Sequence, residues 1–189
     1  MRLAVFCSGN GSNFQAILDA VSKKKLKASI ALMVCDDPKA YAIQRAARGG
    51  VPIAALSPKL FKDRVSYEKF LVQLLKNQNV DLIVLAGFMR ILTPYFIRAY
   101  KNRVVNIHPS YLPAFKGAHA ILDAFDAEVA TTGVTVHIVT AKVDAGPILM
   151  QEKVPVRNSD TLATLEARIH KVEHKLYPKA IQKYLRRLG

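Results

Sequence analysis

Asparagine and histidine side chains stand two positions apart in a short run of otherwise apolar residues. In Asn106-Ile107-His108-Pro109, the two polar side chains would project from the same face of an extended strand. The proline keeps His108 extended, which fixes where the imidazole stands. An amide donor beside a protonatable imidazole suits a carbonyl oxygen that becomes an oxyanion. The simpler alternative is that both side chains only satisfy backbone groups of a loop.

A carboxylate follows downstream at Asp144, in the sequence VDAGP at 143–147. The Gly-Pro pair predicts a turn before the next strand. A carboxylate near His108 would favour the protonated imidazole, but the sequence leaves open whether the two side chains meet. No serine, cysteine or lysine stands in a pattern that activates a nucleophile. We therefore expect a substrate to supply its own nucleophile.

A glycine-rich turn, GNGSN at 9–13, follows a predicted strand and opens a predicted helix. Backbone N–H groups at such a turn form an anion site together with the positive end of the helix dipole, and Ser12 adds a hydroxyl donor. The turn lacks the Gly-Lys-Ser/Thr of a P-loop and the third glycine of the dinucleotide fingerprint. It predicts a phosphate site, with a tight turn that binds no ligand as the alternative.

The segment from Gly87 to Leu92 leaves a fully apolar strand with large apolar side chains at its exit. Such a segment could wall a flat heterocycle while its backbone hydrogen-bonds the ring edge. An ordinary strand-end loop packed on the core is an equal alternative. Arg64 is an isolated cation in a polar stretch and carries no prediction alone.

Short β-rich runs alternate with helical segments, which predicts an α/β fold with one open, mostly parallel twisted sheet flanked by helices. The expected strands are 2–7, 28–35, 52–56, 80–85, 103–107, 133–139 and 148–156. The expected helices begin at Ser12 and Thr93 and span 41–48, 66–77 and 118–125, with a long final helix capped by Ser159 or Asp160 and broken before Pro178. Ligands of such sheets bind beyond the carboxyl ends of the strands, where 9–13, 87–92, 106–113 and 144–147 would lie.

The composition is that of one globular domain spanning 1–189, with 51% hydrophobic residues and a net charge of +14. The excess of basic residues favours anionic partners. Neither interleaved aromatic residues nor an RNA-reading motif accompanies them, so we attribute the charge to solubility and to steering of anions, and nucleic acid is an unlikely partner. The two cysteines, Cys7 and Cys35, have no metal-binding or disulfide spacing. With no signal peptide or membrane span in the sequence, we expect a cytoplasmic protein that binds no metal.

Taken in order, these motifs resemble the folate-dependent formyltransferases. The resemblance rests on GNGSN at 9–13, AGFMRIL at 86–92, NIHPSYLP at 106–113 and DAGPIL at 144–149, and it covers nearly the whole chain. NIHPS with a downstream D-x-G-P is specific to this family. The turn at 9–13 is similar to that of the branch that formylates glycinamide ribonucleotide in purine biosynthesis. The resemblance implies the Rossmann-like fold of the family.

The resemblance also implies a role for each motif. His108 would be the general acid, Asn106 the oxyanion donor, and Asp144 the group that tunes His108. The phosphate and the ribose or glycinamide part of the acceptor would be held by Gly11, Ser12, Asn13 and Glu173. The co-substrate, 10-formyltetrahydrofolate, would be held by Arg64, Met89, Arg90, Ile91, Leu92, Asn106, Thr140 and Asp144. His119 and His137 match positions near the site, whereas His170 stands where an amide is usual and receives no role.

Three other functions remain open at this point. One is a deformylase that acts on formyl-folate, although such an enzyme normally carries an added N-terminal regulatory domain. A methionyl-tRNA formyltransferase shares the Asn-His-Asp chemistry and would suit a basic surface, although it normally carries an added C-terminal domain. A non-enzymatic module that binds phosphate or a nucleotide would explain the glycine turn and the charge. It would leave Asn106, His108 and Asp144 without a purpose.

Overall fold

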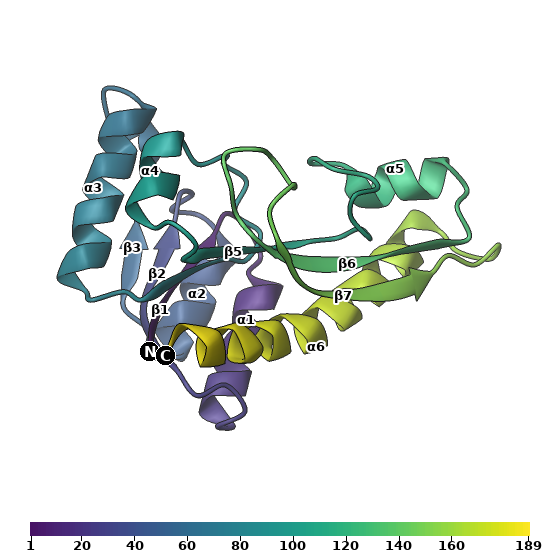
Figure 1. The fold of residues 1–189 in the computed structure, drawn as a ribbon, viewed down its shortest axis with the longest axis horizontal. Helices are drawn as coiled ribbons and strands as arrows, with labels where there is room; N and C mark the ends of the chain where they lie inside the picture. Colours follow the sequence, from purple (N-terminus) through teal and green to yellow (C-terminus); the bar gives the residue numbers. More distant parts are fainter.

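The computed structural model describes residues 1–189 as a single sheet with helices on both faces (Figure 1). The strands are β1 (Arg2–Cys7), β2 (Ser29–Cys35), β3 (Ile53–Ala55), β4 (Leu82–Leu85), β5 (Val104–His108), β6 (Thr131–Ile138) and β7 (Ile148–Pro155). The helices are α1 (Ser12–Ser22), α2 (Tyr41–Arg48), α3 (Arg64–Asn77), α4 (Pro94–Ala99), α5 (Ala120–Asp126) and α6 (Leu162–Leu188), with a 3-10 turn at Pro58–Leu60. The predicted α/β class and the predicted order of elements are confirmed.

The sheet has the order β3-β2-β1-β4-β5-β6-β7. The first five strands of this order are parallel, and β6 and β7 are antiparallel to their neighbours. Because β1, β4 and β5 are parallel neighbours, their carboxyl ends meet at one edge of the sheet. The glycine turn, the segment after β4 and the pair Asn106 and His108 therefore share that edge.

Alternate side chains of β1 enter two different cores. Leu3, Val5 and Cys7 pack with side chains of α1, α2 and α6, whereas Ala4 and Phe6 pack with side chains of α3 and α4. The central strand therefore has both faces buried, which explains why its sequence is continuously apolar rather than alternating. None of the helices combines the length and the apolar character needed to cross a bilayer.

The prediction for the final helix is wrong in two respects. Thr161, not Ser159 or Asp160, caps α6, because its side chain accepts a hydrogen bond from the Thr164 amide. The helix also continues through Pro178 to Leu188. A proline inside a helix costs about 3 kcal/mol, but α6 buries apolar side chains on both sides of it, each contributing about 1.5–3 kcal/mol. These side chains are Leu176, Tyr177, Ile181 and Leu185.

Candidate active site

The glycine turn between β1 and α1 is held by α2. Gly11 has a φ of 73°, and a Cβ at this position would lie 2.8 Å from the Cβ of Ala42, so no other residue fits without strain. Arg45 donates from Nε to the Asn10 carbonyl at 2.9 Å and from Nη2 to the Asn10 side chain at 3.0 Å. The first N–H groups of α1 have no acceptor within the helix. The turn thus presents fixed donors of the kind that bind a phosphate.

Asn13, the second residue of α1, joins this turn to α6. Its Nδ2 donates to Oε2 of Glu173 at 2.9 Å, and both side chains are buried. The Nδ1 of His170 lies 2.8 Å from the same carboxylate oxygen. The Oδ1 of Asn13 is buried and has no hydrogen-bond partner among the protein groups, so it is free to accept a hydrogen bond. A polar ligand at the glycine turn would meet this oxygen and the Glu173 carboxylate.

The end of β5 meets the loop between β6 and β7 at a histidine and a carboxylate. Nδ1 of His108 lies 3.5 Å from Oδ2 of Asp144, and both side chains are largely buried. The other ring nitrogen, Nε2, lies 2.7 Å from the carbonyl oxygen of Phe115. The amide of Gly117 donates to Oδ2 of Asp144 at 3.0 Å. His108 therefore faces an oxygen at each ring nitrogen, which suits a protonated imidazole.

A second histidine, His137 on β6, organises the other side of this cluster. Its Nδ1 lies 3.0 Å from the Ile138 carbonyl, so a neutral ring that donates there has Nε2 free to accept. That Nε2 is 3.3 Å from Nδ2 of Asn106 and 3.5 Å from Oδ1 of Asp144. A neutral His137 therefore orients the Asn106 amide, and a protonated one would donate to Asp144 instead.

Asp144 is held as a carboxylate by these neighbours. Burial alone would raise the pKa of Asp144, but the hydrogen bonds from His137 and from the Gly117 amide, with the charges of His108 and His137, bring that pKa below its ordinary value. Gly146 allows the loop to approach β6, because a Cβ there would lie 1.8 Å from the Ile138 carbonyl oxygen. The negative charge of Asp144 is thus fixed beside both imidazoles.

A cavity of about 400 Å³ opens beside the strand exits. Its walls come from the segment after β4 and from the start of α3 with the turn before it. Phe88 anchors the first wall, since its ring packs edge-on against Phe6 with centroids 5.2 Å apart. On the other wall, Tyr67 has a buried hydroxyl without a hydrogen-bond partner. Five residues predicted to bind formyl-folate line this cavity: Arg64, Met89, Arg90, Ile91 and Leu92.

Arg90 lines this cavity and also pairs with a carboxylate at the end of β2. Its Nε lies 2.6 Å from Oδ2 of Asp36, whose side chain is buried. The neighbouring amide of Met89 donates to Oγ of Ser8 at 2.9 Å. The exits of β1, β2 and β4 are therefore tied together, and the exposed side chains of Met89 and Ile91 are free to contact a ligand.

Most of the remaining predicted residues lie around Asp144. Thr140 stands in the same loop, where its hydroxyl donates to the Lys142 carbonyl at 3.1 Å. His119 is exposed at the start of α5 and makes no hydrogen bond to the cluster.

Sequence reasoning missed the Phe115 carbonyl and the Gly117 amide, because backbone groups carry no sequence signal. The sequence also assigned nothing to His170, although its spacing of three residues from Glu173 on one helix is a signal for such a pair.

Residues 1–181 match the formyl transferase family. The chain therefore belongs to that family, as its motifs predicted. Within the family it is similar to the phosphoribosylglycinamide formyltransferase of Bacillus subtilis (strain 168), with 44% identity over 97% of this chain and 94% of the relative.

Solved structures show the same relationship. The phosphoribosylglycinamide formyltransferase from Bacillus halodurans has a TM-score of 0.96 and 43% identity, covering 100% of this chain and 97% of that chain. Glycinamide ribonucleotide transformylase 1 from Geobacillus kaustophilus has a TM-score of 0.95 and 48% identity, covering 97% and 98%. The predicted enzyme class and the predicted branch of the family are confirmed.

Proposed function

We propose that this chain transfers the formyl group of 10-formyltetrahydrofolate to the amine of glycinamide ribonucleotide. One observation carries the proposal: the buried cluster of Asn106, His108 and Asp144 stands at the same sheet edge as a phosphate-type turn. Full-length similarity to phosphoribosylglycinamide formyltransferases supports this choice of acceptor over methionyl-tRNA. A binding module without catalysis would not need the cluster.

The glycine turn and α6 bind the acceptor in this proposal. The backbone amides after Gly11 and the Ser12 hydroxyl hold the phosphate. The unpartnered Oδ1 of Asn13 accepts from a hydroxyl or amine of the acceptor. Glu173 receives hydrogen bonds from Asn13 and His170 through Oε2 alone, which leaves Oε1 available for the ribose or glycinamide portion.

The cavity beside β4 fits the pterin ring of the co-substrate. Its volume of about 400 Å³ and its apolar walls suit a flat heterocycle. The Tyr67 hydroxyl, buried without a partner, is available to a polar edge of a bound ring. Arg64 lies at the rim of the cavity, where its half-exposed guanidinium would attract the anionic glutamate end of the folate. Thr140 and Asp144 do not line this cavity, and in this proposal they contact the part of the folate that extends from it toward His108.

The cluster of Asn106, His108 and Asp144 supports the transfer by stabilising the charge on the formyl oxygen and by supplying a proton to the leaving nitrogen. Bound 10-formyltetrahydrofolate supplies the formyl carbon, and the acceptor amine supplies the nucleophile. Asn106 donates from its amide to the formyl oxygen as negative charge develops there. His108 turns its Nε2 from the Phe115 carbonyl to the substrate and donates a proton to the departing folate nitrogen. The proton that the acceptor amine releases as its new C–N bond forms returns the imidazole to its protonated form. Asp144 compensates the imidazolium charge before transfer and positions the ring.

We also propose that the reaction takes place in the cytoplasm. Cys7 and Cys35 are both buried and form no disulfide with each other, as is usual for proteins of a reducing compartment. Burial and the nearby Cys35 and Asp36 raise the pKa of Cys7 far above its ordinary value, so this thiol is unreactive.

Acceptor-dependent consumption of the co-substrate tests the proposed function. The purified protein is incubated with 10-formyltetrahydrofolate, with and without glycinamide ribonucleotide, and loss of formyl-folate is followed by absorbance. We expect turnover only when the acceptor is present, and none with methionyl-tRNA in its place. Equal loss without the acceptor would identify a deformylase, and formylation of methionyl-tRNA would identify the other branch of the family.

A further inference from the structure

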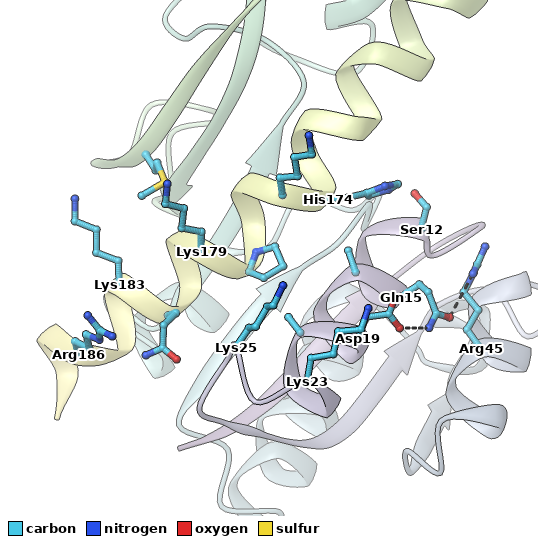
Figure 2. Close-up of a pocket in the computed structure, with 16 residues that line it drawn as sticks. Ser12, Gln15, Asp19, Lys23, Lys25, Arg45, His174, Lys179, Lys183 and Arg186 are labelled. Atoms are coloured by element: carbon cyan, nitrogen blue, oxygen red, sulfur yellow. Dashed lines mark hydrogen bonds between the residues drawn. The ribbon is translucent and has the colours of Figure 1, made fainter.

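A second and larger cavity begins at the glycine turn and extends away from the site described above, as a groove of about 990 Å³ between α1 and α6 (Figure 2). One face of each helix lines it. From α1 come Ser12, Gln15, Ala16, Asp19 and Ala20, and from α6 come His174, Lys175, Pro178, Lys179, Gln182, Lys183 and Arg186. Small side chains of α1 and the proline of α6 leave the floor open. Of the residues assigned to the transfer reaction, only Ser12 reaches this groove.

The groove carries a concentrated positive charge. Its cationic residues are Lys23, Lys25, Arg45, Lys175, Lys179, Lys183 and Arg186, and Asp19 is its one carboxylate. None of the five lysines takes part in an ion pair. Asp19 accepts a hydrogen bond from Gln15 at 2.8 Å and neutralises no lysine. Uncompensated cations on facing walls repel one another, so an anion in the groove would relieve that repulsion.

The length of the groove requires more than one anionic group. Along α6, Lys175 and Arg186 are eleven residues apart, which corresponds to about 16 Å at the helical rise. Lys175, Lys179 and Lys183 recur every fourth residue and therefore form a row about 6 Å apart. A single phosphate bound at Ser12 would fill only one end. The charges match a linear ligand with several phosphates.

The lining indicates which polyanion fits. No phenylalanine, tyrosine or tryptophan lines the groove, so the bases of single-stranded nucleic acid would have no stacking platform. The volume falls in the range of small-molecule sites. Met150, Pro178 and the alanines of α1 provide apolar contact for one flat ring.

We propose that this groove is a binding site for a nucleoside polyphosphate. The phosphate chain lies along the lysine row of α6, opposite Lys23 and Lys25 on the turn after α1, and the nucleoside lies on the apolar floor. Because Ser12 belongs both to this groove and to the glycine turn, a ligand that occupies the groove as far as Ser12 excludes the phosphate of the acceptor. Bound polyphosphate therefore inhibits the transferase competitively with the acceptor.

Direct binding measurements test the site independently of catalysis. A nucleoside triphosphate and inorganic tripolyphosphate are titrated into the full chain by calorimetry at about 50 mM and 200 mM salt. The imidazole of His174, which lines the groove, serves as a local NMR reporter. We expect both ligands to bind and to shift the His174 resonance, with the nucleoside triphosphate tighter because of the apolar floor. Binding of tripolyphosphate equal to that of the nucleoside triphosphate would overturn the nucleoside part of the proposal.

A matched pair of variants separates the groove from the general charge of the protein. The variant Lys179→Gln/Lys183→Gln removes two groove cations, and Lys69→Gln/Lys76→Gln removes two exposed cations from α3, on the opposite face of the sheet. We expect polyphosphate affinity to fall about tenfold or more in the groove variant and less than about twofold in the control. Equal weakening in the two variants would refute a defined site, as would the absence of binding to wild type at the higher salt. Binding of a short RNA that survives excess nucleoside triphosphate would reassign the groove to nucleic acid.

Discussion

The two oxygens that face His108, one from Asp144 and one from the Phe115 carbonyl, hold its ring before any substrate binds. The ring is therefore oriented by protein groups on both sides. In the proposed mechanism, Nε2 leaves the Phe115 carbonyl while Nδ1 stays beside the Asp144 carboxylate. Replacement of the histidine distinguishes this proton-donor role from a purely structural one.

His108→Ala should lower kcat by about 10²–10⁴-fold, because a positioned general acid contributes that much. The affinity for formyl-folate should stay within about threefold, since His108 does not line the cavity beside β4. Single-turnover kinetics and equilibrium fluorescence titration measure the two quantities. His108→Gln, which keeps a hydrogen-bond donor for Phe115 but no acid, serves as the control for folding. Retention of wild-type kcat in either folded variant would contradict the mechanism.

His170 should make acceptor binding sensitive to pH. The hydrogen bond to Glu173 raises the pKa of His170 against the opposing effect of burial, and the charges of Glu173 and Glu166 add to the rise. The nearby His174 has its pKa lowered, chiefly by burial. The imidazolium of His170 is thus fully present below the ordinary value of about 6.5 and is lost as pH rises through the raised pKa.

The KM for glycinamide ribonucleotide should therefore increase as pH rises through the raised pKa of His170, because a positive charge beside the proposed acceptor site disappears. In His170→Gln the amide keeps a donor to Glu173 but cannot titrate, so this part of the pH dependence should vanish. Initial rates between about pH 6 and pH 9 in both proteins measure the difference. An identical pH profile in the variant would show that His170 does not act on the acceptor.

At the scale of elements, helix α6 connects the proposed acceptor site to the two strands whose ends carry the proposed catalytic site. It carries Glu173 beside α1, and one turn later it is tied to the sheet by Tyr177. The buried hydroxyl of Tyr177 lies 2.8 Å from the Leu85 carbonyl and 3.2 Å from the Val105 carbonyl. These carbonyls belong to β4 and β5. The segment that begins at Gly87 follows the first, and Asn106 follows the second.

Tyr177→Phe should lower the free energy of unfolding by about 1–3 kcal/mol, because it removes a donor from two buried carbonyls. Urea denaturation measures the change. Tyr95→Phe on α4 is the matched control, since the Tyr95 hydroxyl makes no side-chain hydrogen bond, and its effect should be below about 0.5 kcal/mol. Equal stability of the two variants would mean that packing alone holds α6 in place.

The excess positive charge acts at the scale of the whole molecule. A net charge of +14 on 189 residues produces a long-range field that attracts both proposed substrates, which are anions. Steering of this kind raises association rates and is screened by salt. Salt screens the electrostatic interactions within the buried cluster much less.

The ratio kcat/KM for glycinamide ribonucleotide should therefore fall several-fold when potassium chloride rises from about 50 mM to 200 mM. The value of kcat at saturating acceptor should change little over the same range. Steady-state kinetics at constant pH provides both numbers, and chloride avoids competition from phosphate or sulfate at the glycine turn. A kcat that falls in parallel would place the salt effect in the chemical step.

The sequence by itself determined the fold class, the order of the elements and the motifs that carry the chemistry, because these depend on local patterns. Buried parallel strands are continuous apolar runs, and the pair Asn106 and His108 shares a face through strand geometry alone. Local rules failed at Pro178, where the apolar contacts of α6 with the sheet outweigh the preference of a proline to end a helix.

Only the tertiary structure decided which distant groups meet. Asp144 reaches His108 because β6 and β7 return antiparallel beside β5, and the Phe115 carbonyl faces the same ring because its loop folds back over the strand end. The spacing of the lysines in α6 predicts only a solvated face of a helix. They form one wall of a groove because α1 packs against that helix. Contacts of this kind depend on how elements far apart in the chain pack against one another. A local pattern of residues does not show which of these elements will meet.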